Sequence, residues 1–169
     1  MRSPILIVGL PGVGKTTLIR SLAGGYGLSN CAGFFTQERR AGGRRTGFSW
    51  ETFEGKNGIL ADLTQGQPRV GRYRVVLHSF EDMLTTIPAP THEKLLLIDE
   101  VGKMECLSEK FRILLPAWEH CNCPRVFTVP TYGTPFIEEF KRRNRTHLVI
   151  LTSQNRDEIL RQLAESLKS

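Results

Sequence analysis

The segment Gly9-Leu10-Pro11-Gly12-Val13-Gly14-Lys15-Thr16 decides the fold of this chain. It fits the pattern G-x-x-x-x-G-K-[ST] at every fixed position, follows the apolar run Pro4 to Val8 and opens a helical pattern. Glycines let the backbone curl so that several N–H groups point at one anion, and the following helix aims its N-terminus at the same place. Lys15 would then reach the β- and γ-phosphates of a nucleotide, and the Thr16 hydroxyl would ligate Mg²⁺. The segment therefore predicts a phosphate-binding loop.

The second chemical feature is an acidic pair that follows a buried strand. The run Leu95 to Ile98 is continuously apolar, as in a strand covered on both faces, and Asp99 and Glu100 come directly after it. Such a carboxyl end lies at the edge of an open α/β sheet where ligands bind. We expect Asp99 to hold the Mg²⁺, directly or through water. Glu100 can polarise a water for attack on the γ-phosphorus, which favours a hydrolase over a kinase, although an ordinary surface carboxylate stays an alternative.

Apolar runs alternate with helix-like segments, which indicates βαβ units and a mainly parallel sheet. The pattern predicts one domain over residues 1–169, with a β-hairpin inserted at about residues 31–62. The hairpin strands are Gly33 to Glu38 and Thr46 to Phe53, joined by a turn at residues 41–44, and Asn57-Gly58 marks a further turn. The other expected strands are Pro4 to Val8, Lys94 to Ile98, Arg125 to Val129 and His147 to Leu151. Helices are expected from Gly14 to about Gly25, after Ser108 with a kink or early end at Pro116, and from about Ser153 to Leu167.

The composition is that of an ordinary soluble protein, with 40% hydrophobic and 24% charged residues among 169. No apolar run approaches the length that spans a bilayer, and no signal peptide is recognisable, so we expect a cytoplasmic protein. The net charge of +6 suits phosphate-bearing partners of any kind. Among the four cysteines only Cys121 and Cys123 are close, which is not zinc-finger spacing, so free reduced thiols are expected.

Several longer runs resemble the THEP-type nucleoside-triphosphatases over nearly the whole chain. The resemblance rests on Gly9 to Leu18, Gly33-Phe-Phe-Thr-Gln-Glu38, Gly43 to Phe48, Val70 to Tyr73, Ile98-Asp-Glu-Val-Gly-Lys-Met-Glu105 and Thr152 to Arg156. It implies a RecA-like P-loop core and slow, Mg²⁺-dependent release of phosphate from ATP, GTP, CTP and UTP with broad base preference. The segment Thr131-Tyr132-Gly133 departs from the family's more basic loop, so base preference could differ here.

The candidate site combines these motifs. Nucleotide binding is assigned to Gly9, Leu10, Pro11, Gly12, Val13, Gly14, Lys15, Thr16, Thr17 and Arg156, the metal to Thr16 and Asp99, and catalysis to Glu100, Lys15 and Lys103. Lys103 follows the metal-binding strand and could neutralise charge on the γ-phosphate, while Arg44 and Arg45 could close over the phosphates as a lid. A solvated side chain or an ion pair is the alternative for each of these cations.

Three other functions remain open. A nucleotide or small-metabolite kinase would use the same loop, with the hairpin as acceptor site. A nucleic-acid-associated ATPase would use the basic patches, although no nucleic-acid-binding motif is recognisable. A non-catalytic nucleotide switch would not need Glu100. The expected oligomeric state is a monomer.

Overall fold

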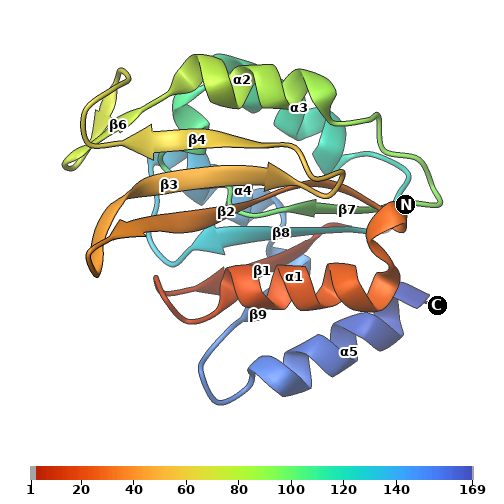
Figure 1. Ribbon diagram of the computed structural model, residues 1–169. Helices are drawn as coiled ribbons and strands as arrows, with labels where there is room; N and C mark the ends of the chain where they lie inside the picture. Colours follow the sequence, from red (N-terminus) through yellow and green to blue (C-terminus); the bar gives the residue numbers. More distant parts are fainter. Residues whose placement is uncertain (1–2, 169) are drawn as a thin grey trace.

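The computed structural model describes residues 3–168, which form one nine-stranded sheet with helices on both faces (Figure 1). The helices are α1 (Lys15–Tyr26), α2 (Leu77–Thr86), α3 (Glu109–Glu119), α4 (Pro135–Arg143) and α5 (Arg156–Lys168). The strands are β1 (Ile5–Gly9), β2 (Cys31–Ala41), β3 (Arg44–Thr52), β4 (Asn57–Asp62), β5 (Arg69–Val70), β6 (Tyr73–Val75), β7 (Leu95–Ile98), β8 (Arg125–Pro130) and β9 (Leu148–Ile150). Short 3₁₀ turns lie at Leu28–Asn30, Glu105–Leu107 and Arg145–His147.

The sheet has a parallel half and an antiparallel half, in the order β5-β6-β4-β3-β2-β7-β8-β1-β9. The strands β2, β7, β8, β1 and β9 pair in parallel, as the alternation of apolar runs and helices predicts. Beyond β2 the named strands pair in antiparallel fashion, from β3 through β4 to β6 and β5. The inserted element is therefore larger than the expected hairpin, because Asn57-Gly58 begins the strand β4 instead of forming a turn.

Strand β2 belongs to both halves of the sheet. Its first residues, Cys31 to Phe34, pair with β7 in the parallel core, whereas the residues from Thr36 onward pair only with β3. The two glycines that join β2 to β3, Gly42 and Gly43, have φ values of 55° and 75°, the left-handed region that a tight hairpin turn requires. The β2/β3 hairpin consequently projects past the carboxyl edge of the parallel strands (Figure 1).

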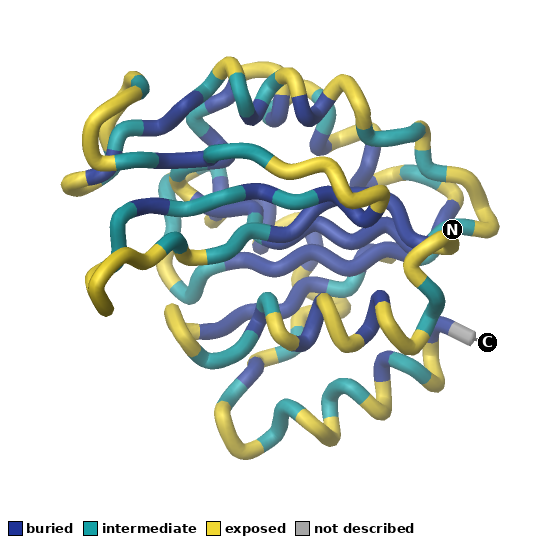
Figure 2. Tube along the Cα trace, in the orientation of Figure 1, coloured by how far each residue is buried: buried dark blue, intermediate teal, exposed yellow. Residues whose placement is uncertain are grey.

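Two apolar cores lie on opposite faces of the sheet, and the central strands are buried on both sides (Figure 2). Helices α1 and α5 cover one face, where Leu18, Leu22 and Leu163 pack. Helices α2, α3 and α4 cover the other, where Phe80, Phe111 and Phe140 are fully buried. A continuously apolar strand such as β7 is explained by this double covering. No helix within residues 3–168 is long and apolar enough to cross a membrane.

Helix α1 ends at Tyr26, close to the expected end near Gly25, and Gly27 after it takes a φ of 95°. Helix α3 continues past Pro116 to Glu119, so the early end that was expected as one alternative is wrong. Helices α2 and α4 were not predicted, although Thr134 caps α4 by accepting from the Ile137 N–H, directly before Pro135. Cys121 and Cys123 form a disulfide, so the expectation of free thiols holds for the buried Cys31 and Cys106 and not for this pair.

Helix α3 offers a matched test of the core packing. Phe111 is fully buried, whereas Ile113, two residues along the same helix, is 69% exposed. Phe111→Ala should lower the free energy of unfolding by about 3–5 kcal/mol, because it leaves a cavity, and Ile113→Ala should change it by less than about 1 kcal/mol. Urea denaturation followed by circular dichroism measures both. Equal losses for the two variants would contradict the burial described here.

Candidate active site

The candidate site is a cleft of about 980 Å³ at the carboxyl edge of the parallel strands. The loop after β1 forms its floor, the residues after β7 form one wall, and the projecting β2/β3 hairpin forms another. Parallel strands bring their carboxyl ends to the same edge, so motifs that are far apart in the sequence meet here. The cleft lining includes Gly12, Gly14, Lys15, Thr16, Thr17, Arg20, Glu38, Arg45, Phe48, Glu100, Lys103, Met104, Glu105 and Tyr132.

The loop after β1 has the backbone that its glycines permit. Gly12 and Gly14 have φ values of 77° and 104°, and Gly14 is the N-cap of α1. The side chain of Arg156, from the start of α5, lies so close to Gly14 that an added Cβ would be 2.9 Å from its Nη1. The N-terminus of α1 can bind an anion, and Arg156 lies beside it, although Arg156 is not among the residues that line the cleft.

Lys15 is held at the floor of this loop. Its side chain is 8% exposed, and its ammonium donates to the carbonyl of Gly9 at 2.9 Å and to that of Leu10 at 3.3 Å. The same ammonium lies 4.0 Å from Oε1 of Glu100. The cation therefore sits between the glycine loop and the residues that follow β7, where it can face a bound anion and Glu100 together.

Asp99 is buried between two threonines. The Thr16 hydroxyl donates to its Oδ2 and the Thr128 hydroxyl to its Oδ1, both at 2.6 Å. Burial raises the pKa of Asp99, while these hydrogen bonds, the backbone N–H of Thr36 and the charge of Lys15 oppose that rise. Thr128 was not among the predicted site residues, and its signal in the sequence is a single polar residue inside the apolar run of β8. Both carboxylate oxygens thus have fixed positions.

The carboxylate of Glu100 lies beside these groups and faces the cleft. Its side chain is 28% exposed, so water can reach it. Burial raises the pKa of Glu100; the charge of Lys15 lowers it, and that of Asp99 raises it further. A carboxylate with a raised pKa is a stronger base once ionised, which suits proton abstraction from water.

Glu105 is a buried carboxyl that the motif analysis did not single out. It is 5% exposed, and its Oε2 lies so close to Gly102 that an added Cβ there would be 2.6 Å away. Burial raises the pKa of Glu105 well above the ordinary value, and the charges of Glu100 and Asp99 act in the same direction. A neutral Glu105 behind Glu100 avoids a third negative charge in one small volume.

The remaining candidate residues are not all brought together. Lys103 lines the cleft but its side chain is exposed. Arg45 lines the cleft and pairs with Glu38, whereas Arg44 is exposed and is not part of the cleft lining. Tyr132, in the loop that departs from the family pattern, is at the rim and 80% exposed.

The basic run at the end of α4 is largely neutralised. Arg142 pairs with Glu139 at 2.8 Å, and Arg143 pairs with the buried Glu119 at 3.0 Å. Lys141 pairs with Glu138 at 2.9 Å. These ion pairs give the run a structural explanation and remove most of the support for a nucleic-acid surface there.

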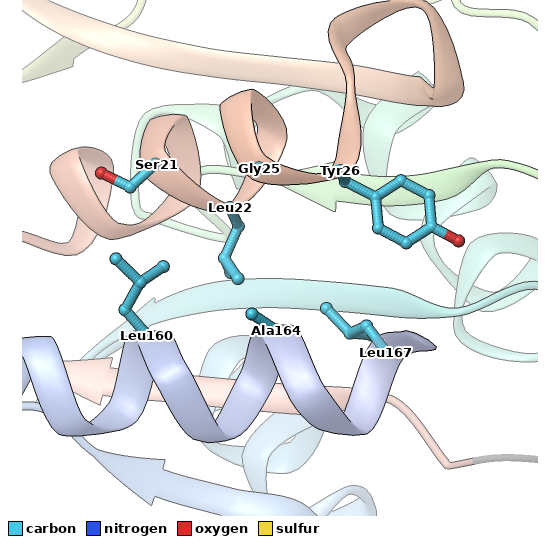
Figure 3. Close-up of a pocket in the computed structure, with 7 residues that line it drawn as sticks. All are labelled: Ser21, Leu22, Gly25, Tyr26, Leu160, Ala164 and Leu167. Carbon is cyan, nitrogen blue, oxygen red and sulfur yellow. The ribbon is translucent and has the colours of Figure 1, made fainter. Parts of the chain in front are cut away.

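A second hollow, of about 240 Å³, lies between α1 and α5 (Figure 3). Its lining is mostly apolar, with Leu22, Leu160 and Leu167 facing one another across the two helices. Within the described residues it brings no cluster of charged groups to one place. The phosphate chemistry of the molecule therefore belongs to the first cleft.

The buried carboxyl of Glu105 predicts a pH dependence of stability. Because its pKa is raised in the folded state, folding favours the protonated form, and stability should fall as the pH rises above the ordinary glutamate value of 4.5. Glu105→Gln keeps the shape without the charge, so it should raise the melting temperature at neutral pH and flatten this decline. Thermal unfolding from pH 4 to 8 measures the effect, with the exposed Glu109→Gln as control. A parallel decline in wild type and Glu105→Gln would contradict the assignment.

Three comparisons agree with this arrangement. The sequence model of a family described as NTPase matches residues 4–164. A nucleoside-triphosphatase THEP1 from Thermotoga sp. (strain RQ2) is 41% identical over 167 residues, which cover 97% of this chain and 95% of the relative.

Two solved structures share the architecture. The crystal structure of THEP1 from Aquifex aeolicus superposes with a TM-score of 0.88 at 36% identity, over 98% of this chain and 99% of the other. The solution structure of a human cancer-related nucleoside triphosphatase gives a TM-score of 0.77 at 31% identity, over 99% and 98%. Matches of this extent cover both halves of the sheet and the cleft. The chain belongs to the THEP-type nucleoside-triphosphatase family.

Proposed function

We propose that this enzyme is a Mg²⁺-dependent phosphohydrolase that releases the γ-phosphate of ATP, GTP, CTP and UTP. The observation that carries the proposal is the position of Glu100: its carboxylate faces the cleft, 4.0 Å from the Lys15 ammonium and one residue after the buried Asp99. A base next to the cation that meets the terminal phosphates can direct a water at the γ-phosphorus.

The residues around the cleft divide the work of the reaction. The glycine loop and the N-terminus of α1 bind the phosphates through backbone N–H groups, and Arg156 adds a charge at the Gly14 side. Lys15 binds the β- and γ-phosphates and stabilises negative charge that develops on the leaving group. Glu100 accepts a proton from the attacking water. Lys103 lies at the rim, where its long side chain can approach the γ-phosphate.

The donor set at Asp99 fits a magnesium ion. Thr16, which lines the cleft, and the buried Asp99 bring a hydroxyl and a carboxylate oxygen within 2.6 Å of each other, and both are the hard oxygen ligands that Mg²⁺ prefers. Thr128 holds the other oxygen of Asp99, so the carboxylate has a fixed orientation toward Thr16. Thr16 and Asp99 would hold the ion, which would supply positive charge to stabilise the negative charge of the phosphates.

Broad base preference is part of the same proposal. Phosphate contacts made by a glycine loop and a helix N-terminus use backbone groups that are shared by every nucleoside triphosphate. The exposed Tyr132 would not enclose a base. A monomer in the cytosol, where all four substrates are available, is the simplest setting.

Phosphate release tests the proposal. With Mg²⁺ and no acceptor, the wild type should release phosphate from all four nucleotides, and EDTA should stop it. Glu100→Gln should lower kcat by about a hundredfold or more, because it removes the base, while the protein still binds nucleotide. A coupled phosphate assay measures turnover, and equilibrium dialysis measures binding.

The exposed Glu54→Gln is the matched control and should leave turnover unchanged. Unchanged turnover in Glu100→Gln would overturn its role as the base. Phosphate loss from ATP that requires an added acceptor would replace the hydrolase with the kinase alternative.

A further inference from the structure

The cleft extends well past the residues assigned to the triphosphate. Its volume of about 980 Å³ lies near the top of the range of roughly 300–1,000 Å³ for small-molecule sites. One end holds the glycine loop, Lys15 and Thr16. The other end, here called the hairpin arm, is lined by Arg45, Phe48, Leu60, Val70 and Met104.

The order of strands places the hairpin arm beyond the γ-phosphate. The glycine loop follows β1, Glu100 follows β7, and the residues of the arm come mainly from β3, β4 and β5, on the far side of β7 and β2. Arg156 lies in the opposite direction, against Gly14 and next to β9. This step rests on the proposed function, which puts the γ-phosphate between Lys15 and Glu100. A triphosphate seated in that way leaves the arm free.

The polar chemistry of the arm centres on the guanidinium of Arg45. It lies over the ring of Phe48, at 5.6 Å from the ring centroid, and pairs with Glu38. Arg40 pairs with the same carboxylate at 2.7 Å, so two cations share one anion and a net positive charge remains. The Nε of Arg45 is buried and has no hydrogen-bond partner within residues 3–168. A ligand in the cleft cannot reach an atom that is buried in this way, but the Arg45 side chain as a whole is 38% exposed, so the rest of the guanidinium can face the cleft.

The apolar part of the arm is built around one aromatic ring. The ring of Phe48 is fixed by an edge contact with Tyr73, at 5.2 Å between centroids. Leu60 is 1% exposed, and the partly buried Met104 and Val70 complete the lining. A methionine thioether and an aromatic face suit a planar ring, whereas a fully hydrated polar ligand would gain little there. The arm therefore combines a ring-binding surface with a cation for an acidic group.

We propose that the hairpin arm binds a second ligand, a nucleoside monophosphate, with its base on Phe48 and Met104 and its phosphate at Arg45. An arginine fork matches phosphate oxygens, and the Arg45 side chain is 38% exposed where it lines the cleft, so its guanidinium can meet a phosphate there. The ligand occupies the cleft together with the triphosphate, on the other side of Glu100. It is a separate binding site of the same enzyme.

Calorimetric titration tests this binding. Protein saturated with Mg²⁺ and a non-hydrolysable ATP analogue is titrated with AMP, GMP, CMP, UMP and inorganic phosphate. At least one monophosphate should bind at one site per chain, and more tightly than inorganic phosphate, which lacks the ring. Arg45→Gln should weaken that binding about tenfold or more, and Phe48→Leu should weaken it as well. Arg44→Gln removes the same charge from the same strand, outside the cleft, and should have no effect.

Thermal unfolding of each variant shows whether it is still folded, so that a loss of binding is not mistaken for a loss of folding. Absence of monophosphate binding to the loaded protein would overturn the inference. So would a monophosphate that the ATP analogue displaces, since it would then lie at the glycine loop, or equal losses in Arg44→Gln and Arg45→Gln. Intact hydrolysis without monophosphate binding refutes this inference alone, whereas monophosphate binding without hydrolysis refutes the proposed function alone.

Discussion

The carboxylate of Asp99 is the interaction on which the site depends. It accepts from Thr16 at the start of α1 and from Thr128 in β8, while its own backbone continues β7. One buried group thus joins three elements, although Thr16 and Thr128 lie 83 and 29 residues from Asp99 along the chain. Burying a carboxylate costs several kcal/mol unless hydrogen bonds compensate, so the arrangement persists only when all three elements are in place. A change in the position of the glycine loop would therefore also change the position of the proposed metal ligands.

The antiparallel half of the sheet turns a phosphate-binding edge into a cleft. A parallel core alone would offer the glycine loop, Asp99 and Glu100 on an open edge. The long strand β2 carries the chain past that edge, and β3 returns beside it. Gly33, with a φ of 110°, makes this possible, because an added Cβ would lie 2.0 Å from the carbonyl oxygen of Leu97. The tight pairing of β2 with β7 sets the position of the hairpin relative to Glu100.

Local signals made much of the fold predictable. Short runs of consecutive residues were enough to predict the glycine loop, the strands β1, β7 and β8, and the acidic pair after β7. Helix α4 carried an equally local signal in Thr134-Pro135 and could have been found. Other features depend on which distant segments pack together. These are the burial of Glu105, the hydrogen bond from Thr128 to Asp99 and the position of Arg45 in the cleft. No periodicity or spacing in one sequence reports such contacts.

Strand β1 has a consequence for how the protein is made. It lies between β8 and β9, with Ile5 beside Val126 and Leu6 beside Leu148. During synthesis β1 therefore leaves the ribosome long before either neighbour exists, and its apolar residues stay unpaired until β8 and β9 have been made. Contacts of such large sequence separation slow folding and prolong the exposure of apolar surface. The antiparallel strands β2 to β4, which pair with near neighbours, can form earlier. The glycine loop that follows β1 therefore reaches its final position only after β8 and β9 have been made.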